Sequence, residues 1–215
     1  GFYKNIGIPP IASKGYAQNF PLYLSISEKS VIALNGSNYL FKKDFIYTRI
    51  TSEKPIDFNE VVFCGYGITD DKYDDYKIAG DVKDKVIMIM EGEPLNKDSV
   101  YLITGEKKKS SWSLGVFRKM ELAKKNGAKA VFIIANDYEA SVKSFQRFLE
   151  HPSLMLDKGN GKECAFFIIN KEMTDVFFKN NADNLNPDKL RKIIGENGQP
   201  KSIVLKLKST SIQFN

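Results

Sequence analysis

Histidine is scarce in this chain, and its scarcity limits the chemistry that the side chains can perform. His151, followed by Pro152, is the only histidine among 215 residues. A catalytic zinc ion generally takes histidine and carboxylate ligands and keeps one position open for water. A Ser–His–Asp or Cys–His arrangement would also have to use His151, and no G-x-S-x-G turn marks a nucleophilic serine. We therefore predict no catalytic residue and no metal ligand in this chain.

Four aspartates, Asp70, Asp71, Asp74 and Asp75, form a cluster that invites a calcium interpretation. An EF-hand loop needs oxygen ligands at alternate positions, glycine at the sixth and glutamate at the twelfth. The segment TDDKYDDYKIAGD does not have that spacing. We favour a solvated loop, while an ion site assembled from several loops stays open.

Two glycines, Gly65 and Gly67, flank Tyr66 at the end of an apolar run. They are not part of a phosphate-binding loop, since neither G-x-G-x-x-G nor G-K-[ST] is present. Glycine tolerates conformations that other residues avoid, so this pair predicts a tight turn where the chain leaves a central strand.

The positive charge of the chain, +6 with a pI near 9.1, raises the question of nucleic-acid binding. Its basic residues are 28 lysines and only four arginines, spread along the sequence, and the one tight cluster is at residues 107–109. Arginine is the usual bidentate reader of phosphates and bases. We therefore predict no nucleic-acid partner, and no apolar run is long enough for a membrane span.

The two cysteines, Cys64 and Cys164, each lie inside an apolar run that is typical of a strand. The favoured interpretation is two buried thiols that pack as small hydrophobic groups. A disulfide would require the two strands to be neighbours, and two cysteines alone are not a disulfide framework. Whether they pair stays open at this point.

The order of apolar segments predicts a mixed α/β domain. An Asn35-Gly36 pair between apolar runs predicts a hairpin; a β-like pattern starts at residue 21, residues 45–50 form a further candidate strand, and residues 203–207 alternate as a half-exposed strand. Nearly continuous apolar runs, which predict central strands buried on both faces, occupy residues 61–66, 85–90, 130–135 and 164–169.

Helices are expected between and after these runs. The strongest pattern covers residues 113–126, with Val116, Met120 and Ala123 on one face, Leu114 and Phe117 adjoining it, and Gly127 as the terminating residue. Further helices are expected at residues 141–149, at 171–180 after an Asn170 cap with Met173, Val176 and Phe177 inward, and from Asn186-Pro187 to about residue 195.

Motifs between residues 61 and 137 resemble the protease-associated (PA) domain that is inserted in secreted bacterial zinc aminopeptidases of the aminopeptidase Y and glutamate carboxypeptidase type. They are GYGI at residues 65–68, Asp75-Tyr76, DVKDKV at 81–86, GEP at 92–94 and GAKAV at 127–131. The usual form of the third motif is DVKGKV, so Asp84 replaces a glycine, which alters one tight turn. The resemblance implies a curved mixed β-sheet, an open barrel or sandwich, with flanking helices.

The resemblance also implies an organisation and a role. Residues 1–20 would be a lead-in from the first part of a peptidase domain, 21–208 the PA-like domain, and 209–215 the start of the return to the missing catalytic domain. No signal peptide is visible at Gly1, so the chain looks truncated. The implied function is a non-catalytic domain of an exported zinc peptidase that covers the peptidase cleft and modulates substrate access or protein contacts. The two-zinc ligand set of such peptidases includes two histidines, so zinc would belong to the missing catalytic domain.

Two alternatives stay open: a PA-type module of a sorting receptor, and the PA domain of a subtilisin-like protease. The implied partners are the parent's own peptidase domain and a peptide or protein substrate, and the implied location is the periplasm, the cell surface or the medium. Aromatic residues on loops after central strands suit partner contact, against the plainer interpretation of ordinary loops with a partly buried tryptophan. The candidate contact residues are Tyr66, Tyr73, Tyr76 and Trp112.

Overall fold

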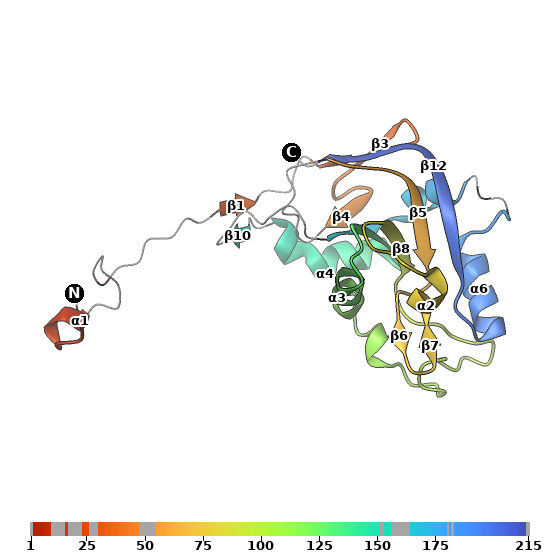
Figure 1. Ribbon diagram of the computed structural model, residues 1–215, viewed down its shortest axis with the longest axis horizontal. Helices are drawn as coiled ribbons and strands as arrows, with labels where there is room; N and C mark the ends of the chain where they lie inside the picture. The colour runs from red at the N-terminus through yellow and green to blue at the C-terminus, as the bar shows by residue number, and fades with distance from the viewer. Residues whose placement is uncertain are drawn as a thin grey trace.

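An eight-stranded mixed sheet forms the centre of the molecule in the computed structural model (Figure 1). The structure describes residues 2–9, 16, 23–25, 30–47, 55–150, 153–155, 164–179, 181 and 183–213. The strands follow the order β3-β2-β12-β5-β8-β9-β11-β4. They are β2 (Val31–Leu34), β3 (Ser37–Leu40), β4 (Phe45–Tyr47), β5 (Ile56–Cys64), β8 (Val86–Met90), β9 (Ala130–Ile134), β11 (Ala165–Ile169) and β12 (Ser202–Gln213).

The four central runs are parallel neighbours, as their continuous apolar character predicts. β5 pairs with β8, β8 with β9, and β9 with β11, all in parallel. The outer strands are antiparallel: β12 on β5, β2 on β12, β3 on β2, and β4 on β11. An isolated bridge between Phe41 and Phe45 joins the two ends of this order. The sheet is therefore nearly closed, which confirms the predicted mixed α/β fold with a curved sheet.

Alternate side chains of the central strands pack into two separate cores. Residues such as Phe63, Met88 and Phe132 point to one face and pack with α5 (Lys171–Phe178) and α6 (Pro187–Asn197). Their sequence neighbours, such as Ile87 and Val131, point to the other face. That face is covered by α2 (Asp75–Ala79), α3 (Phe117–Lys125) and α4 (Tyr138–Glu150). In Figure 1 α3 and α4 lie on the opposite side of the sheet from α6.

The smaller elements complete the described chain. The predicted hairpin is confirmed, since Asn35 and Gly36 both have positive φ between β2 and β3. The chain between β8 and α3 contains a short 3-10 helix, η1. None of the described helices is long and apolar enough to cross a membrane. The remaining elements are α1 (Phe2–Asn5), β1 (Tyr23–Ser25) paired with β10 (Ser153–Met155), β6 (Thr69–Asp70) paired with β7 (Tyr73–Asp74), and η1 (Ser111–Ser113).

The helix expected at residues 113–126 starts later than predicted. Gly115 has a φ of 113°, which an α-helix does not accept, so α3 begins only at Phe117. Val116, Met120 and Ala123 are buried as predicted, whereas Leu114 and Phe117 are exposed, and Phe117 adjoins the core at its edge through Phe145. The helix expected at 141–149 is longer, because Asp137 accepts from the backbone N–H of Ala140 and starts α4 at Tyr138.

Two further expectations meet the structure at the ends of elements. β12 extends to Gln213, and Thr210–Gln213 pair with β2, so the sheet continues past residue 208, the expected end of the domain. The expected strand at 45–50 is β4 as far as Tyr47, and residues 48–50 lie outside the described residues. Asp84 has a φ of 59°, so this position in DVKDKV is a turn that favours glycine.

Candidate functional site

A groove with a volume of about 650 Å³ opens at the carboxyl ends of β8 and β9, between α3 and α4. Its volume is within the range of about 300–1,000 Å³ that is usual for ligand pockets. Ligands of α/β proteins bind outside the carboxyl ends of parallel strands, because the loops that leave the strands converge there. Here those loops contribute Glu91 and Gly92 after β8, and Asn136 and Asp137 after β9.

One side of the groove is apolar and open to solvent. Leu114, Phe117 and Phe148 line it with 82%, 59% and 58% of their surface exposed. Phe117 of α3 and Phe145 of α4 have ring centroids 5.8 Å apart, and Phe145 lies 6.3 Å from Phe148. The three rings form a continuous aromatic row that joins the two helices. Exposed apolar surface gathered in a concave site is typical of a surface that binds another molecule.

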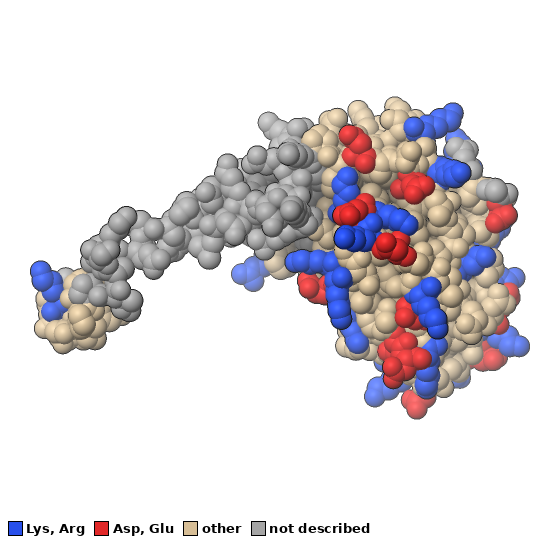
Figure 2. All heavy atoms as spheres, in the orientation of Figure 1, with Lys and Arg blue, Asp and Glu red and all other residues tan. Residues whose placement is uncertain are grey.

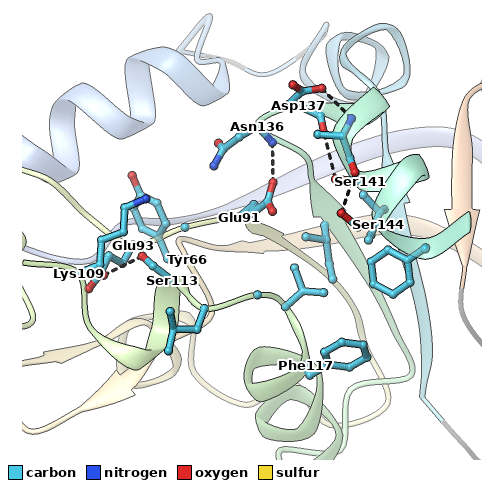
Figure 3. A pocket seen from close by; sticks show the side chains of 18 of the residues that line it. Tyr66, Glu91, Glu93, Lys109, Ser113, Phe117, Asn136, Asp137, Ser141 and Ser144 are labelled. Carbon is cyan, nitrogen blue, oxygen red and sulfur yellow. Dashed lines mark hydrogen bonds between the residues drawn. The ribbon is translucent and has the colours of Figure 1, made fainter.

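The other side of the groove is polar and held in place by hydrogen bonds. The backbone N–H of Asn136 donates to Glu91 Oε2 at 2.9 Å, and Arg191 of α6 donates to Asn136 Oδ1 at 2.9 Å. In Figure 3 Glu91, Asn136 and Asp137 lie together, apart from Phe117. At this edge a ligand would meet the carboxylate of Glu91, the amide of Asn136 and the guanidinium of Arg191.

Glu93 holds the segment that connects β8 to α3 and lines the groove. Its carboxylate accepts from the backbone N–H and the hydroxyl of Ser110, both at 2.7 Å, and from the Ser113 hydroxyl at 2.7 Å. The side chain is buried, and each bond involves a charged acceptor, which makes the bonds stronger than neutral ones. Glu93 is therefore used for structure and is not free to act as an acid or base.

Behind this turn lies a buried lysine that the sequence analysis missed. Lys119 on α3 is 0% exposed, and its Nζ donates to the carbonyl oxygens of Met90, at 3.0 Å, and Gly92. Burial lowers the pKa of Lys119 to about 7, against the opposing effect of Asp75, Glu91 and Glu93. A signal was present: Lys119 lies three residues after Val116 and four before Ala123, on the buried face of the helix.

Asp75 is another buried ionisable side chain, at 1% exposure, which corrects the prediction that the aspartate cluster is solvated. Its carboxylate accepts from the backbone N–H groups of Tyr66 and Ile68, both at 3.0 Å, and from the Tyr73 hydroxyl at 2.9 Å. Burial raises the pKa of Asp75 to about 7, although these hydrogen bonds and Lys119 lower it. A Cβ at Gly65 would lie 2.0 Å from Asp75 Oδ1, so the GYG turn needs glycine to admit this carboxylate.

Two other aspartates of the cluster, Asp74 and Asp70, form structural hydrogen bonds. Asp74 caps α2 by accepting from Lys77 N, and Asp70 accepts from the indole N–H of Trp112 at 3.2 Å. Among the described residues no group of three histidines, cysteines or acids could hold a metal ion. His151 lies outside the described residues.

The four aromatic residues expected to contact a partner are all buried. Tyr66, Tyr73, Tyr76 and Trp112 are between 3% and 8% exposed. The expectation that these rings are presented on the loop surface is therefore wrong, although Tyr66 lines the groove. Trp112 is covered by the Arg118 guanidinium, 3.8 Å from its ring. Their role in partner contact stays a prediction, and any effect would pass through the loops that they hold.

The two cysteines are free and buried, which confirms the favoured interpretation. Both lie in the core on the α3 and α4 side of the sheet. Burial raises the pKa of both thiols, to about 12 for Cys164. They therefore stay protonated and unreactive near neutral pH.

The surface charge does not form a single basic region on the face shown in Figure 2. Lysine and arginine are interspersed there with aspartate and glutamate. The prediction on nucleic acid is untested by this view.

Comparison with known proteins gives a likeness of fold only. No protein-family model matches the chain, and no curated protein matches it. Among solved structures it is similar to an aminopeptidase from Aneurinibacillus sp. strain AM-1, with a TM-score of 0.38 and 16% identity over 89% of this chain and 33% of that one. It is also similar to a zinc aminopeptidase from Bacillus subtilis, with a TM-score of 0.36 and 15% identity over 90% of this chain and 36% of that one.

The chain thus spans about a third of the length of these two bacterial aminopeptidases. A likeness of this degree assigns no activity, and the function proposed below rests on residues of the chain itself.

Proposed function

We propose that this chain is a protease-associated type domain of a larger exported zinc peptidase, and that it contacts peptide or protein through the groove between α3 and α4. The observation that carries the proposal is the exposed group Leu114, Phe117 and Phe148, whose two rings meet over the buried Phe145 in a concave site at the carboxyl ends of the central strands. The order of the GYGI, DVKDKV, GEP and GAKAV motifs supports the domain type.

In this proposal the domain supplies contact and leaves the chemistry to the rest of the parent. The described residues do not fit a zinc site, because no three potential ligands gather among them. Glu93, the buried carboxylate nearest the groove, is committed to Ser110 and Ser113. The domain would cover the peptidase cleft and influence which peptides reach it, and the zinc would be held by the parent's other residues.

The contact role is tested directly on the purified chain. The probe is the pentapeptide acetyl-Ala-Leu-Phe-Leu-Ala-amide, titrated into isotope-labelled chain while amide signals are followed by NMR. We expect signals of residues 113–117 and 144–148 to shift, because apolar side chains would pack against the aromatic row. The polar pentapeptide acetyl-Ala-Ser-Asn-Ser-Ala-amide is the matched control. Equal shifts with both peptides, or none with either, would contradict the groove as a contact site.

The role in a parent enzyme is tested by kinetics. Phe117→Ser combined with Phe148→Ser removes exposed surface, so the fold should persist. We expect KM for long peptides to rise about tenfold or less while kcat is unchanged, since the reaction occurs elsewhere. The earlier candidates Trp112→Ala and Tyr73→Ala test the same KM-against-kcat split, but they also open cavities because both rings are buried. A drop in kcat with KM unchanged would contradict a purely contacting domain.

A further inference from the structure

The two buried charges behind the groove have no direct ionic partner within the described part of the chain. Ion pairs between described residues are formed by Lys171 with Asp175 and by Lys192 with Glu196, both on the surface. Asp75 and Lys119 are instead held by backbone groups. A buried charge without a salt bridge costs free energy, so a fold that keeps two of them uses them for position or response.

Each of the two side chains holds a different part of the same groove wall. Lys119 donates to the carbonyl oxygens of Met90 and Gly92, and Gly92 lines the groove. Asp75 accepts from the N–H of Tyr66, whose side chain also lines the groove. The Tyr66 ring connects the two, because Lys119 Nζ lies 5.5 Å from its centroid.

The electrostatic surroundings make both groups sensitive to protons near neutrality. Burial moves the pKa of Asp75 up and that of Lys119 down, each to about 7. Each favours the charged form of the other, since Lys119 lowers the pKa of Asp75 and Asp75 raises the pKa of Lys119. The other titratable or charged groups that act on the pair come from the strand ends and helices around it: Cys64, Tyr66, Tyr73, Tyr76, Glu91, Glu93 and Arg191.

We infer that Asp75 and Lys119 form a proton-dependent anchor that positions Tyr66 and Gly92, so that the shape of the groove wall changes across neutral pH. A protonated amine is a stronger donor than a neutral one. Loss of the proton from Lys119 therefore weakens its hold on the Gly92 carbonyl, and the segment after β8 loosens. The consequence for peptide binding rests on the function proposed above, whereas the anchor itself does not.

The anchor is tested on the chain alone by NMR titration between pH 5.5 and 8.5. We expect the Asp75 carboxyl carbon and the Lys119 ε-methylene to titrate near pH 7, and the amides of Tyr66 and Gly92 to shift with the same midpoints. Asp75→Asn should lower the midpoint of Lys119, and Lys119→Met should raise that of Asp75, because each variant removes the charge that favours the other's ionised form. A purely structural role would not produce these reciprocal shifts.

Matched controls separate the pair from the background of the chain. Lys124→Met changes an exposed lysine on the same helix, and Asp71→Asn an exposed aspartate of the same cluster. Both variants should leave the two midpoints unchanged. The amide of Gly198, after α6, should not share the midpoint. Asp75 and Lys119 signals that stay flat across this range, or midpoints unmoved by the partner variant, would overturn the inference even if both variants fold.

The second measurement concerns the groove. The affinity for acetyl-Ala-Leu-Phe-Leu-Ala-amide should be weaker at pH 8 than at pH 6 by roughly threefold or more in the wild type, and unchanged between the two in the double variant Asp75→Asn, Lys119→Met, in which neither anchor group titrates. If the anchor titrates as described but the pentapeptide binds at neither pH, the contact function fails and the anchor stands. If the pentapeptide binds equally at both pH values, the coupling of anchor and groove is overturned.

Discussion

The two helical layers of this domain treat their apolar side chains differently. α5 and α6 turn Met173, Phe177, Leu190 and Ile194 into the core, and no large apolar side chain of either helix is strongly exposed. α3 and α4 bury Met120 and Phe145 in the same way but leave Phe117 and Phe148 in solvent. The first layer closes the nearly barrel-like sheet, and the second both covers the sheet and presents a surface.

The start of α3 differs from the starts of α5 and α6. Asn170 and Asn186 cap α5 and α6 by accepting from the N–H groups of Met173 and Lys189. The residue before α3 is Val116, whose side chain makes no cap hydrogen bond. Helix capping stabilises a helix end and leaves nothing free for a ligand. The uncapped helix α3 borders the groove, as expected where a fold gives up stability for function, whereas α4, which also borders it, is capped by Asp137.

The largest expected effect comes from a charge placed on the buried face of α3. Met120→Asp places an unpaired charge between α3 and the sheet, and we expect it to cost several kcal/mol of stability. Phe117→Asp, on the same helix but at an exposed position, is the control and should change stability by less than about 1 kcal/mol. Chemical denaturation of both variants checks the face assignment. A Met120→Asp protein that melts within a few degrees of the wild type would refute it.

A smaller effect is the pH dependence of stability that Asp75 and Lys119 give to the layer formed by α2, α3 and α4. The folded pKa of Asp75, about 7, is above its ordinary value of 3.8. Its contribution to the free energy of unfolding is therefore full below about pH 4 and is lost as the pH rises to 7. The folded pKa of Lys119, about 7, is below its ordinary value of 10.5. Its contribution to the free energy of unfolding is therefore full above about pH 10.5 and is lost as the pH falls to 7. Together the two groups predict that their combined contribution to the free energy of unfolding is smallest near neutral pH.

The measurement is the free energy of unfolding between pH 5 and 9, compared with the double variant Asp75→Asn, Lys119→Met. The wild type should lose stability relative to the variant as the pH approaches 7 from either side. The two proteins share every other ionisable residue, so the difference isolates Asp75 and Lys119. A difference that is constant, or largest in favour of the wild type at pH 7, contradicts the assigned directions.

A third prediction sharpens the comparison of the helix starts. Asn170→Ala and Asn186→Ala each remove a cap and should cost about 1 kcal/mol. Asn126→Ala, at the end of α3, removes a side-chain bond to the Leu122 carbonyl and serves as the matched asparagine control, which we expect to cost less. Thermal unfolding in parallel gives the ranking. Equal losses in all three would show that the caps of α5 and α6 are not special.

Much of the fold could be predicted from the sequence because it depends on local patterns. Continuous apolar runs identified the four parallel strands, Asn35-Gly36 identified the hairpin, and Asn170 and Asn186 identified two helix starts. The groove could not be predicted in this way. It depends on the exposed Phe117 and Phe148 of two helices that meet only in the folded chain, and an apolar residue in a helix is expected in the core.

The buried pair escaped prediction for a related reason. Aspartate and lysine are rarely buried, so Asp75 in an acidic run and Lys119 in an amphipathic helix are both expected in solvent. Their burial depends on backbone partners outside their own helices: Tyr66 and Ile68 for Asp75, and the more distant Met90 and Gly92 for Lys119. Such backbone partners have no sequence signature. Only the position of Lys119 on the apolar stripe of α3 was a usable clue.

The smallest expected effect concerns the turn that joins the α3 layer to β8. Asp84 has a φ of 59°, and its backbone N–H donates to the Gly127 carbonyl at the end of α3. Non-glycine residues pay a penalty in this left-handed region, which aspartate only partly escapes. Asp84→Gly should therefore stabilise the domain by about 0.5–1 kcal/mol, reduced by the greater freedom that glycine gives the unfolded chain.

Ser99, also at a φ of 59° but in the 95–101 loop, is the matched position for Ser99→Gly. A higher melting temperature for Asp84→Gly, with unchanged titration of Lys119, would show that this turn tunes stability without disturbing the groove. A lower melting temperature would mean that the Asp84 side chain contributes more to the turn than its strained backbone costs.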